Sequence, residues 1–80
     1  MDKNEILVKV NEIFKDAFGK DDLKIVFETT AADIEGWDSL MQINLIEMIE
    51  DEFNIRFSMD EVVGMANVGE MIGRIEEKLQ

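Results

Sequence analysis

The sequence predicts an all-α fold, a four-helix bundle with a long loop between helices one and two and a short third helix. Apolar residues recur at helical spacing in three stretches of the 80-residue chain. A fourth, shorter stretch begins with the spacing of a helix cap and ends at a glycine. No proline, repeat or low-complexity tract divides the chain, so we expect a single domain over residues 1–80.

The first helix is predicted from one apolar stripe that ends at Gly19. The stripe consists of Ile6, Leu7, Val10, Ile13, Phe14, Ala17 and Phe18.

Residues 20–38 follow without a helical stripe. Apolar residues alternate there at Leu23, Ile25 and Phe27, as in a strand, but the sequence offers no second strand to satisfy the backbone. We therefore expect an extended loop that these side chains pin to the bundle, with residues 30–34 as a candidate helical turn.

The second helix is predicted over residues 39–52, with its end near Asn54. Its stripe consists of Met41, Leu45, Met48, Ile49 and Phe53. Ser58 and Glu61 have the spacing of a capping box, so they predict a short third helix over residues 59–63. Gly64 closes that segment.

The last helix is predicted from a stripe that runs to the end of the chain. The stripe consists of Val68, Met71, Ile72, Ile75 and Leu79. Asn67 and Glu70 are spaced as the N-cap of this helix and its reciprocal partner. Four helices, one of them short, must then share one core, and we expect them to form an antiparallel bundle.

The chain contains neither His nor Cys, which narrows its chemistry. It cannot form a Ser-His-Asp triad, a Cys-His pair, a disulfide or a conventional zinc site. A calcium-binding loop also fails, because aligning Gly36 with the required glycine puts Ala31 at the first ligand position. We therefore expect no enzyme activity, no catalytic residue and no metal site.

Acidic residues dominate the charge, with a formal net charge of −11. This sign argues against nucleic acid and anionic membranes as partners. The longest apolar runs are triplets, too short for a membrane span or a signal peptide, so we expect a cytoplasmic protein. We also expect a monomer. Residues 25–80 hold thirteen acids and three bases. That stretch either faces a basic partner or is an ordinary solvated surface.

Asp38, Ser39 and Leu40 mark the start of the second helix. A helix N-terminus has unpaired N–H groups and a dipole that favours negative charge, so a phosphate attached to Ser39 would be stabilised there. Asp and Ser are also common N-caps, and a capping role alone explains them equally well. On the helical wheel, Leu40 and Ile43 fall about 140° and 160° from Leu45. They are candidates for exposed partner contacts.

In this setting the chain resembles an acyl carrier protein over nearly its whole length. The resemblance covers the four helices, the long loop, the Asp38-Ser39-Leu40 motif and Glu50-Asp51-Glu52-Phe53. It implies that Ser39 carries phosphopantetheine, a covalent cofactor installed from coenzyme A by a phosphopantetheinyl transferase. The arm would hold acyl intermediates as thioesters and present them to acyl-transferring and acyl-modifying enzymes with basic docking patches. Asp38 would then cap the helix, lie within reach of the transferase, or do both.

Three positions of the second helix depart from the carriers of primary fatty-acid synthesis. Met41 and Asn44 stand where those carriers typically have acids, and Glu47 stands where an apolar residue is usual. A tryptophan before the aspartate, here Trp37, also resembles the pattern of stand-alone carriers dedicated to specialised pathways. We therefore expect a dedicated carrier for a fatty-acid, polyketide or related pathway. The alternatives are an aminoacyl or peptidyl carrier and a small acidic protein-interaction domain without a covalent group.

Flexible methionines suit a core that opens to admit acyl chains, although ordinary core packing is the simpler interpretation. The candidate cavity walls are Met48, Met59, Met65, Met71, Ile46, Ile49, Val62 and Val63. Trp37 is either a loop anchor beside the arm or a partner contact, and the sequence does not choose between them.

Overall fold

A computed structural model describes all 80 residues as four α-helices joined by loops, without a strand. The helices are α1 (Lys3–Phe18), α2 (Ser39–Phe53), α3 (Met59–Val63) and α4 (Val68–Leu79), and a 3-10 turn, η1, spans Ala31–Asp33. The all-α prediction and the order of the helices are confirmed, and η1 lies where the sequence suggested one helical turn. No helix is both long enough and apolar enough to cross a membrane.

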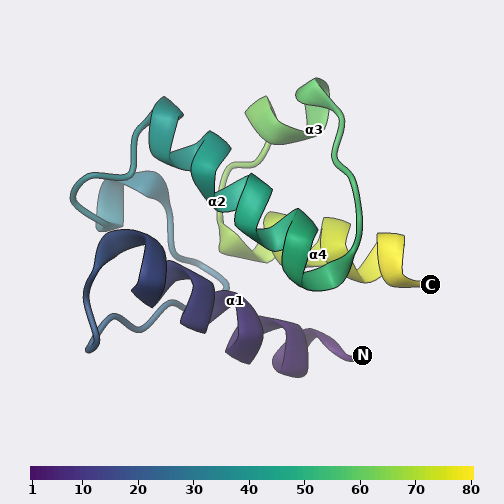
Figure 1. The fold of residues 1–80 in the computed structure, drawn as a ribbon, viewed down its shortest axis with the longest axis horizontal. Helices are drawn as coiled ribbons and strands as arrows, with labels where there is room; N and C mark the ends of the chain where they lie inside the picture. The colour runs from purple at the N-terminus through teal and green to yellow at the C-terminus, as the bar shows by residue number, and fades with distance from the viewer.

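The bundle is built around α1, which contacts both α2 and α4 (Figure 1). Both of these helices run opposite to α1, so the antiparallel arrangement is as predicted. The short α3 contacts α2 and contributes no buried residue. It is therefore attached to the side of the bundle rather than built into its core.

Fifteen buried apolar side chains form one continuous core. They come from all three long helices and from the connections between the helices, and burial of such surface is the main force that holds the fold together. They are Ile6, Val10, Ile13, Phe14, Ile25, Ile34, Leu45, Ile46, Ile49, Phe53, Ile55, Val68, Met71, Ile72 and Ile75.

Polar caps set the helix boundaries. Ser58 and Glu61 form the predicted capping box at α3, with bonds of 3.2 and 2.9 Å. Asn67 caps α4, because its Oδ1 accepts the Glu70 N–H at 2.9 Å. The predicted reciprocal bond is wrong: the Glu70 carboxylate accepts the N–H of Ala66, 2.8 Å away and one residue further back. Both side chains thus still bond to backbone N–H groups at the start of α4, with the Glu70 bond reaching one residue further back than in a capping box.

The long loop is extended, as predicted, and the rest of the bundle satisfies part of its backbone. Asn11 of α1 accepts the Ile25 N–H at 2.7 Å and donates to the Leu23 carbonyl at 3.3 Å. Ile25 is only 2% exposed, and Leu23 and Phe27 pack against the core. A buried side chain and an amide from α1 therefore replace the partner strand that the sequence lacks.

The same loop also caps α4. The N–H groups of Val68 and Gly69 donate to the carbonyls of Thr29 and Phe27 at 2.9 and 2.7 Å. These are N–H groups of the first helical turn, which no residue of α4 itself can accept. The loop is thus held between α1 and α4, and this anchoring determines where its last residues meet α2.

Candidate functional site

The loop reaches α2 through a tight turn that ends in Trp37. Gly36 has φ +91°, a conformation that favours glycine. Trp37 donates its backbone N–H to the Ile34 carbonyl at 3.2 Å, and Ile34 is buried in the core. The indole ring packs edge-on against Phe14 of α1 with centroids 5.1 Å apart. Of the two roles considered for Trp37, the structure supports the loop anchor.

Asp38 is the N-cap of α2, and Ser39 is its first helical residue. The Asp38 carboxylate accepts the Met41 N–H at 2.8 Å. The Ser39 side chain is exposed, and its hydroxyl makes no hydrogen bond within the protein. Capping therefore falls to Asp38, which leaves the Ser39 hydroxyl free to react with a partner.

The next residues of α2 present apolar side chains to solvent. Leu40 is 76% exposed and Ile43 is 47% exposed, which confirms the orientation predicted from the helical wheel. Met59 and Val63 of α3 are also strongly exposed. Apolar side chains of this size at the surface are candidates for contact with a ligand or a protein partner.

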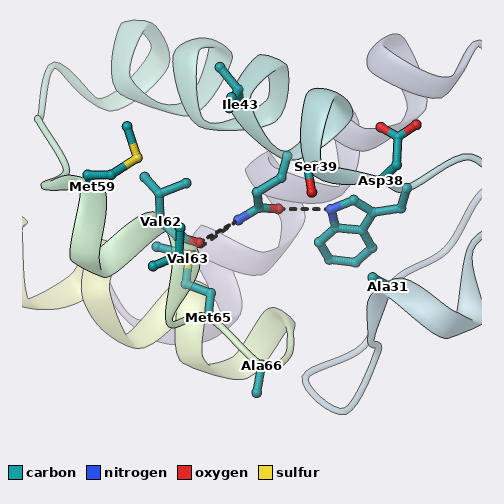
Figure 2. A pocket seen from close by; sticks show the side chains of 11 residues that line it. Ala31, Asp38, Ser39, Ile43, Met59, Val62, Val63, Met65 and Ala66 are labelled. Atoms are coloured by element: carbon teal, nitrogen blue, oxygen red, sulfur yellow. Dashed lines mark hydrogen bonds between the residues drawn. The ribbon is translucent and has the colours of Figure 1, made fainter.

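A pocket of about 420 Å³ opens beside Ser39 (Figure 2). It lies between the start of α2, the end of the long loop, α3 and the connection to α4, and eight of its eleven lining residues are hydrophobic. They are Ala31, Trp37, Asp38, Ser39, Gln42, Ile43, Met59, Val62, Val63, Met65 and Ala66. A volume of this size is sufficient for a small ligand or part of an alkyl chain.

Half of the predicted cavity walls line this pocket. Met59, Val62, Val63 and Met65 do so, and all four come from α3 or the connection that follows it. The other four do not line it: Ile46, Ile49 and Met71 are buried in the bundle core, and Met48 packs against it. These four positions therefore belong to the bundle core and not to the pocket.

Gln42 was not singled out from the sequence, yet it crosses the pocket. Its Oε1 accepts the indole N–H of Trp37 at 2.8 Å, and its Nε2 donates to the Val62 carbonyl at 3.4 Å (Figure 2). The available signal was its spacing of three residues from Ser39, which places both on one face of α2.

An ion pair connects α3 to α4. Lys78 lies 2.9 Å from the Glu61 carboxylate and 5.3 Å from the centre of the Phe57 ring. The backbone N–H of Ser58 and the Lys78 ammonium hold the pKa of Glu61 below its usual value. These contacts stabilise α3 in a position where burial alone does little.

Comparison with known sequences identifies a family match over most of the chain. Residues 8–75 match the family described as a phosphopantetheine attachment site. An acyl carrier protein of Exiguobacterium sp. (strain AT1b) is 35% identical over 79 residues, which cover 99% of this chain and all of the relative. One from Streptococcus thermophilus is 37% identical over 91% of this chain and 95% of its own.

Solved structures agree with the sequence relatives. The solution structure of a holo acyl carrier protein from Geobacter metallireducens has a TM-score of 0.85 at 36% identity, covering 91% of this chain and 84% of its own. The crystal structure of an acyl carrier protein from Thermotoga maritima has a TM-score of 0.86 at 30% identity, covering 99% and 92%.

The family match defines the chemistry expected here. Its prosthetic group is phosphopantetheine, held covalently, and the relatives are named as carriers rather than enzymes. The match, the relatives and the four-helix fold all lead to one assignment: the chain belongs to the phosphopantetheine attachment-site family and, within it, to the acyl carrier proteins.

Proposed function

We propose that Ser39 carries the phosphopantetheine arm. The chain has only two serines. Ser58 is engaged in the α3 capping box, where its hydroxyl accepts the Glu61 N–H at 3.2 Å. Ser39 is exposed, has a free hydroxyl and lies at the edge of the apolar pocket. The observation that carries this proposal is the division of labour at the start of α2, where Asp38 caps and Ser39 remains available.

The helix N-terminus suits a phosphodiester. The N–H groups of Ser39 and Leu40 make no hydrogen bond within the protein, and the helix dipole adds partial positive charge at this end. When bound, phosphopantetheine supplies the terminal thiol that holds an acyl group as a thioester and that this cysteine-free chain lacks. The role of Ser39 and its neighbours is to hold the phosphate at a defined place beside the pocket.

We propose that the pocket shelters apolar parts of the cargo. Five of its eight hydrophobic lining residues come from α3 and the connection after it. An alkyl chain that covers these side chains removes apolar surface from water, which is favourable by about 25 cal/mol per Å². The protein would thereby act as an acyl carrier that also protects its cargo between enzymes.

Loading with coenzyme A and a promiscuous phosphopantetheinyl transferase tests the proposal. Intact mass spectrometry should show the gain of one phosphopantetheine on the wild type and on Ser58→Ala, and no gain on Ser39→Ala. A gain of mass on Ser39→Ala would show that the arm is attached to another residue. A wild type that never gains the group would favour the small acidic interaction domain instead.

We propose a dedicated pathway rather than primary fatty-acid synthesis. Asn44 is exposed on α2 close to Ser39, at a position where an acid would strengthen attraction to a basic docking patch. Asn44→Glu should therefore raise turnover by primary synthase enzymes at low salt, and Asn4→Glu on α1 should not. Equal effects of both variants would show that Asn44 does not set partner choice. An aminoacyl or peptidyl cargo would appear as selective loading by an adenylating enzyme.

We further propose that the carrier acts as a single-domain monomer in the cytoplasm. One core contains all the buried apolar residues, and no buried side-chain nitrogen or oxygen lacks a hydrogen-bond partner. The absence of cysteine also fits a reducing compartment. Light scattering of the loaded protein should give the mass of one chain, and a dimer mass would contradict the monomer.

A further inference from the structure

One carboxamide stands out in the pocket beside Ser39. Apart from Asp38 and Ser39 at the edge, Gln42 supplies the only carboxamide among otherwise apolar or aromatic lining residues. It belongs to α2, and its bonds to Trp37 and Val62 connect the long loop to α3 across the pocket. A chain that enters the pocket therefore has to pass this group.

Trp37 determines which way the carboxamide points. An indole N–H can only donate, so the Gln42 oxygen must face Trp37, where the two atoms lie 2.8 Å apart. The NH₂ end then faces the opposite side, towards Val62 and Met65. The pocket thus presents N–H donors in a defined direction.

Those donors have poor partners within the protein. The Val62 carbonyl lies 3.4 Å from Nε2, longer than the usual 2.7–3.2 Å for such bonds. The Met65 sulfur, at 3.8 Å, is a weak acceptor. An oxygen atom on a bound chain would be a better acceptor than either of them.

We propose that Gln42 makes the pocket selective for acyl chains that carry a carbonyl oxygen along the chain over unsubstituted acyl chains. This inference rests on the proposed function, because it requires an acyl group attached at Ser39. A saturated chain would exclude water from the N–H groups and leave them only the long contact to the Val62 carbonyl and the weak one to the Met65 sulfur, which is unfavourable. An oxo-substituted chain supplies that acceptor while its remaining methylenes contact the apolar walls.

The test measures how well the protein shelters different cargoes. Wild type, Gln42→Leu and the control Asn4→Leu, which makes a similar change on the exposed side of α1, are loaded with octanoyl, 3-oxo-octanoyl or 5-oxo-octanoyl pantetheine arms. The rate of thioester exchange with a small thiol is measured for each loaded protein and for the free pantetheine thioester. The rate for the free thioester is then divided by the rate for the loaded protein. The ratio is the protection factor, and intact mass confirms loading before each measurement.

We expect the wild type and Asn4→Leu to protect at least one oxo chain about three- to tenfold better than octanoyl, equivalent to about 0.7–1.4 kcal/mol. Gln42→Leu should protect octanoyl as well as or better than both oxo chains. A wild type that prefers octanoyl, or a Gln42→Leu variant that keeps the oxo preference, would overturn the inference. Failure to load at all would instead count against attachment at Ser39.

Trp37 provides a second, independent measurement. It is the only tryptophan, and the chain has no tyrosine, so the indole fluorescence comes from one residue of the pocket lining. Its emission should shift on loading with the preferred oxo chain more than with octanoyl. Trp37→Phe keeps a ring against Phe14 but removes the N–H that orients Gln42, so it should reduce the oxo preference. If circular dichroism shows Gln42→Leu to be unfolded, Trp37→Phe takes its place in the protection assay. A Trp37→Phe variant that keeps the full preference for oxo chains would refute the inference.

Discussion

Replacing Ser39 with alanine should abolish loading without weakening the fold. The serine hydroxyl makes no hydrogen bond, and the side chain is exposed, so its removal breaks no contact. Alanine is the better helix former, by up to about 0.5 kcal/mol relative to serine. For a domain of this size, that gain corresponds to a melting temperature unchanged or raised by about 2–4 °C.

Asp38 should behave in the opposite way. Its carboxylate accepts the Met41 N–H at 2.8 Å, and the loss of such a cap typically costs about 1 kcal/mol. Asp38→Ala should therefore lower the melting temperature by about 4–8 °C. Asp38→Asn keeps a capping oxygen and removes the charge, so most of the stability should return while any loss of loading by the transferase persists.

The assay combines thermal melts, followed by far-ultraviolet circular dichroism, with intact mass after incubation with coenzyme A and the transferase. Ser39→Ala should melt at or above the wild-type temperature and gain no mass. A fall of several degrees in Ser39→Ala would refute the assignment of the cap to Asp38. Full stability of Asp38→Ala would refute it equally, since the helix start would then depend on another group.

Two further predictions concern stability. Gly69→Ala should lower the melting temperature, because the new Cβ would lie 3.0 Å from the Phe27 carbonyl oxygen. Gly73→Ala in the same helix is the control: its Cβ meets no atom within 4 Å, so the better helix former should raise the melting temperature by about 4–8 °C. The pKa of Glu61 is lowered in the folded state, chiefly by the Ser58 N–H and by Lys78. Its stabilising contribution should be complete above the ordinary glutamate pKa of about 4.3 and lost as the pH falls through the lower folded value. The difference in melting temperature between wild type and Glu61→Gln should thus be full at pH 7 and pH 5 and shrink below pH 4; a difference that grows below pH 4 would contradict this.

The sequence alone predicts the helices because the signals for them are local. Stripe periodicity places α1, α2 and α4, and α2 ends at Phe53 with Asn54 in the left-handed conformation, within one residue of the prediction. The capping box of Ser58 and Glu61 is equally local, since it depends on a three-residue spacing. Each of these features needs only neighbouring residues, and the chain supplies them without reference to the fold.

The start of the site depends on local signals too, and the family could also be anticipated from the sequence. Ser39 lies at the beginning of α2, and Leu40 and Ile43 lie on the solvent side, as helix geometry requires. The resemblance to acyl carrier proteins depended on the order of these local features along the chain. The family comparison confirms it.

The identity of the residues that surround the pocket depends on long-range packing. Apolar type does not distinguish Ile46 and Ile49, which the core covers, from Val62 and Val63, which line the pocket. The difference depends on how α3 packs against α2, and that packing involves residues far apart in sequence. The bond between Trp37 and Gln42 likewise requires the loop to be anchored by α1 and α4, because Trp37 belongs to that loop and lies outside the helix that carries Gln42. Sequence periodicity determines the direction of a side chain from its own helix, whereas the neighbours that it meets are set by long-range packing.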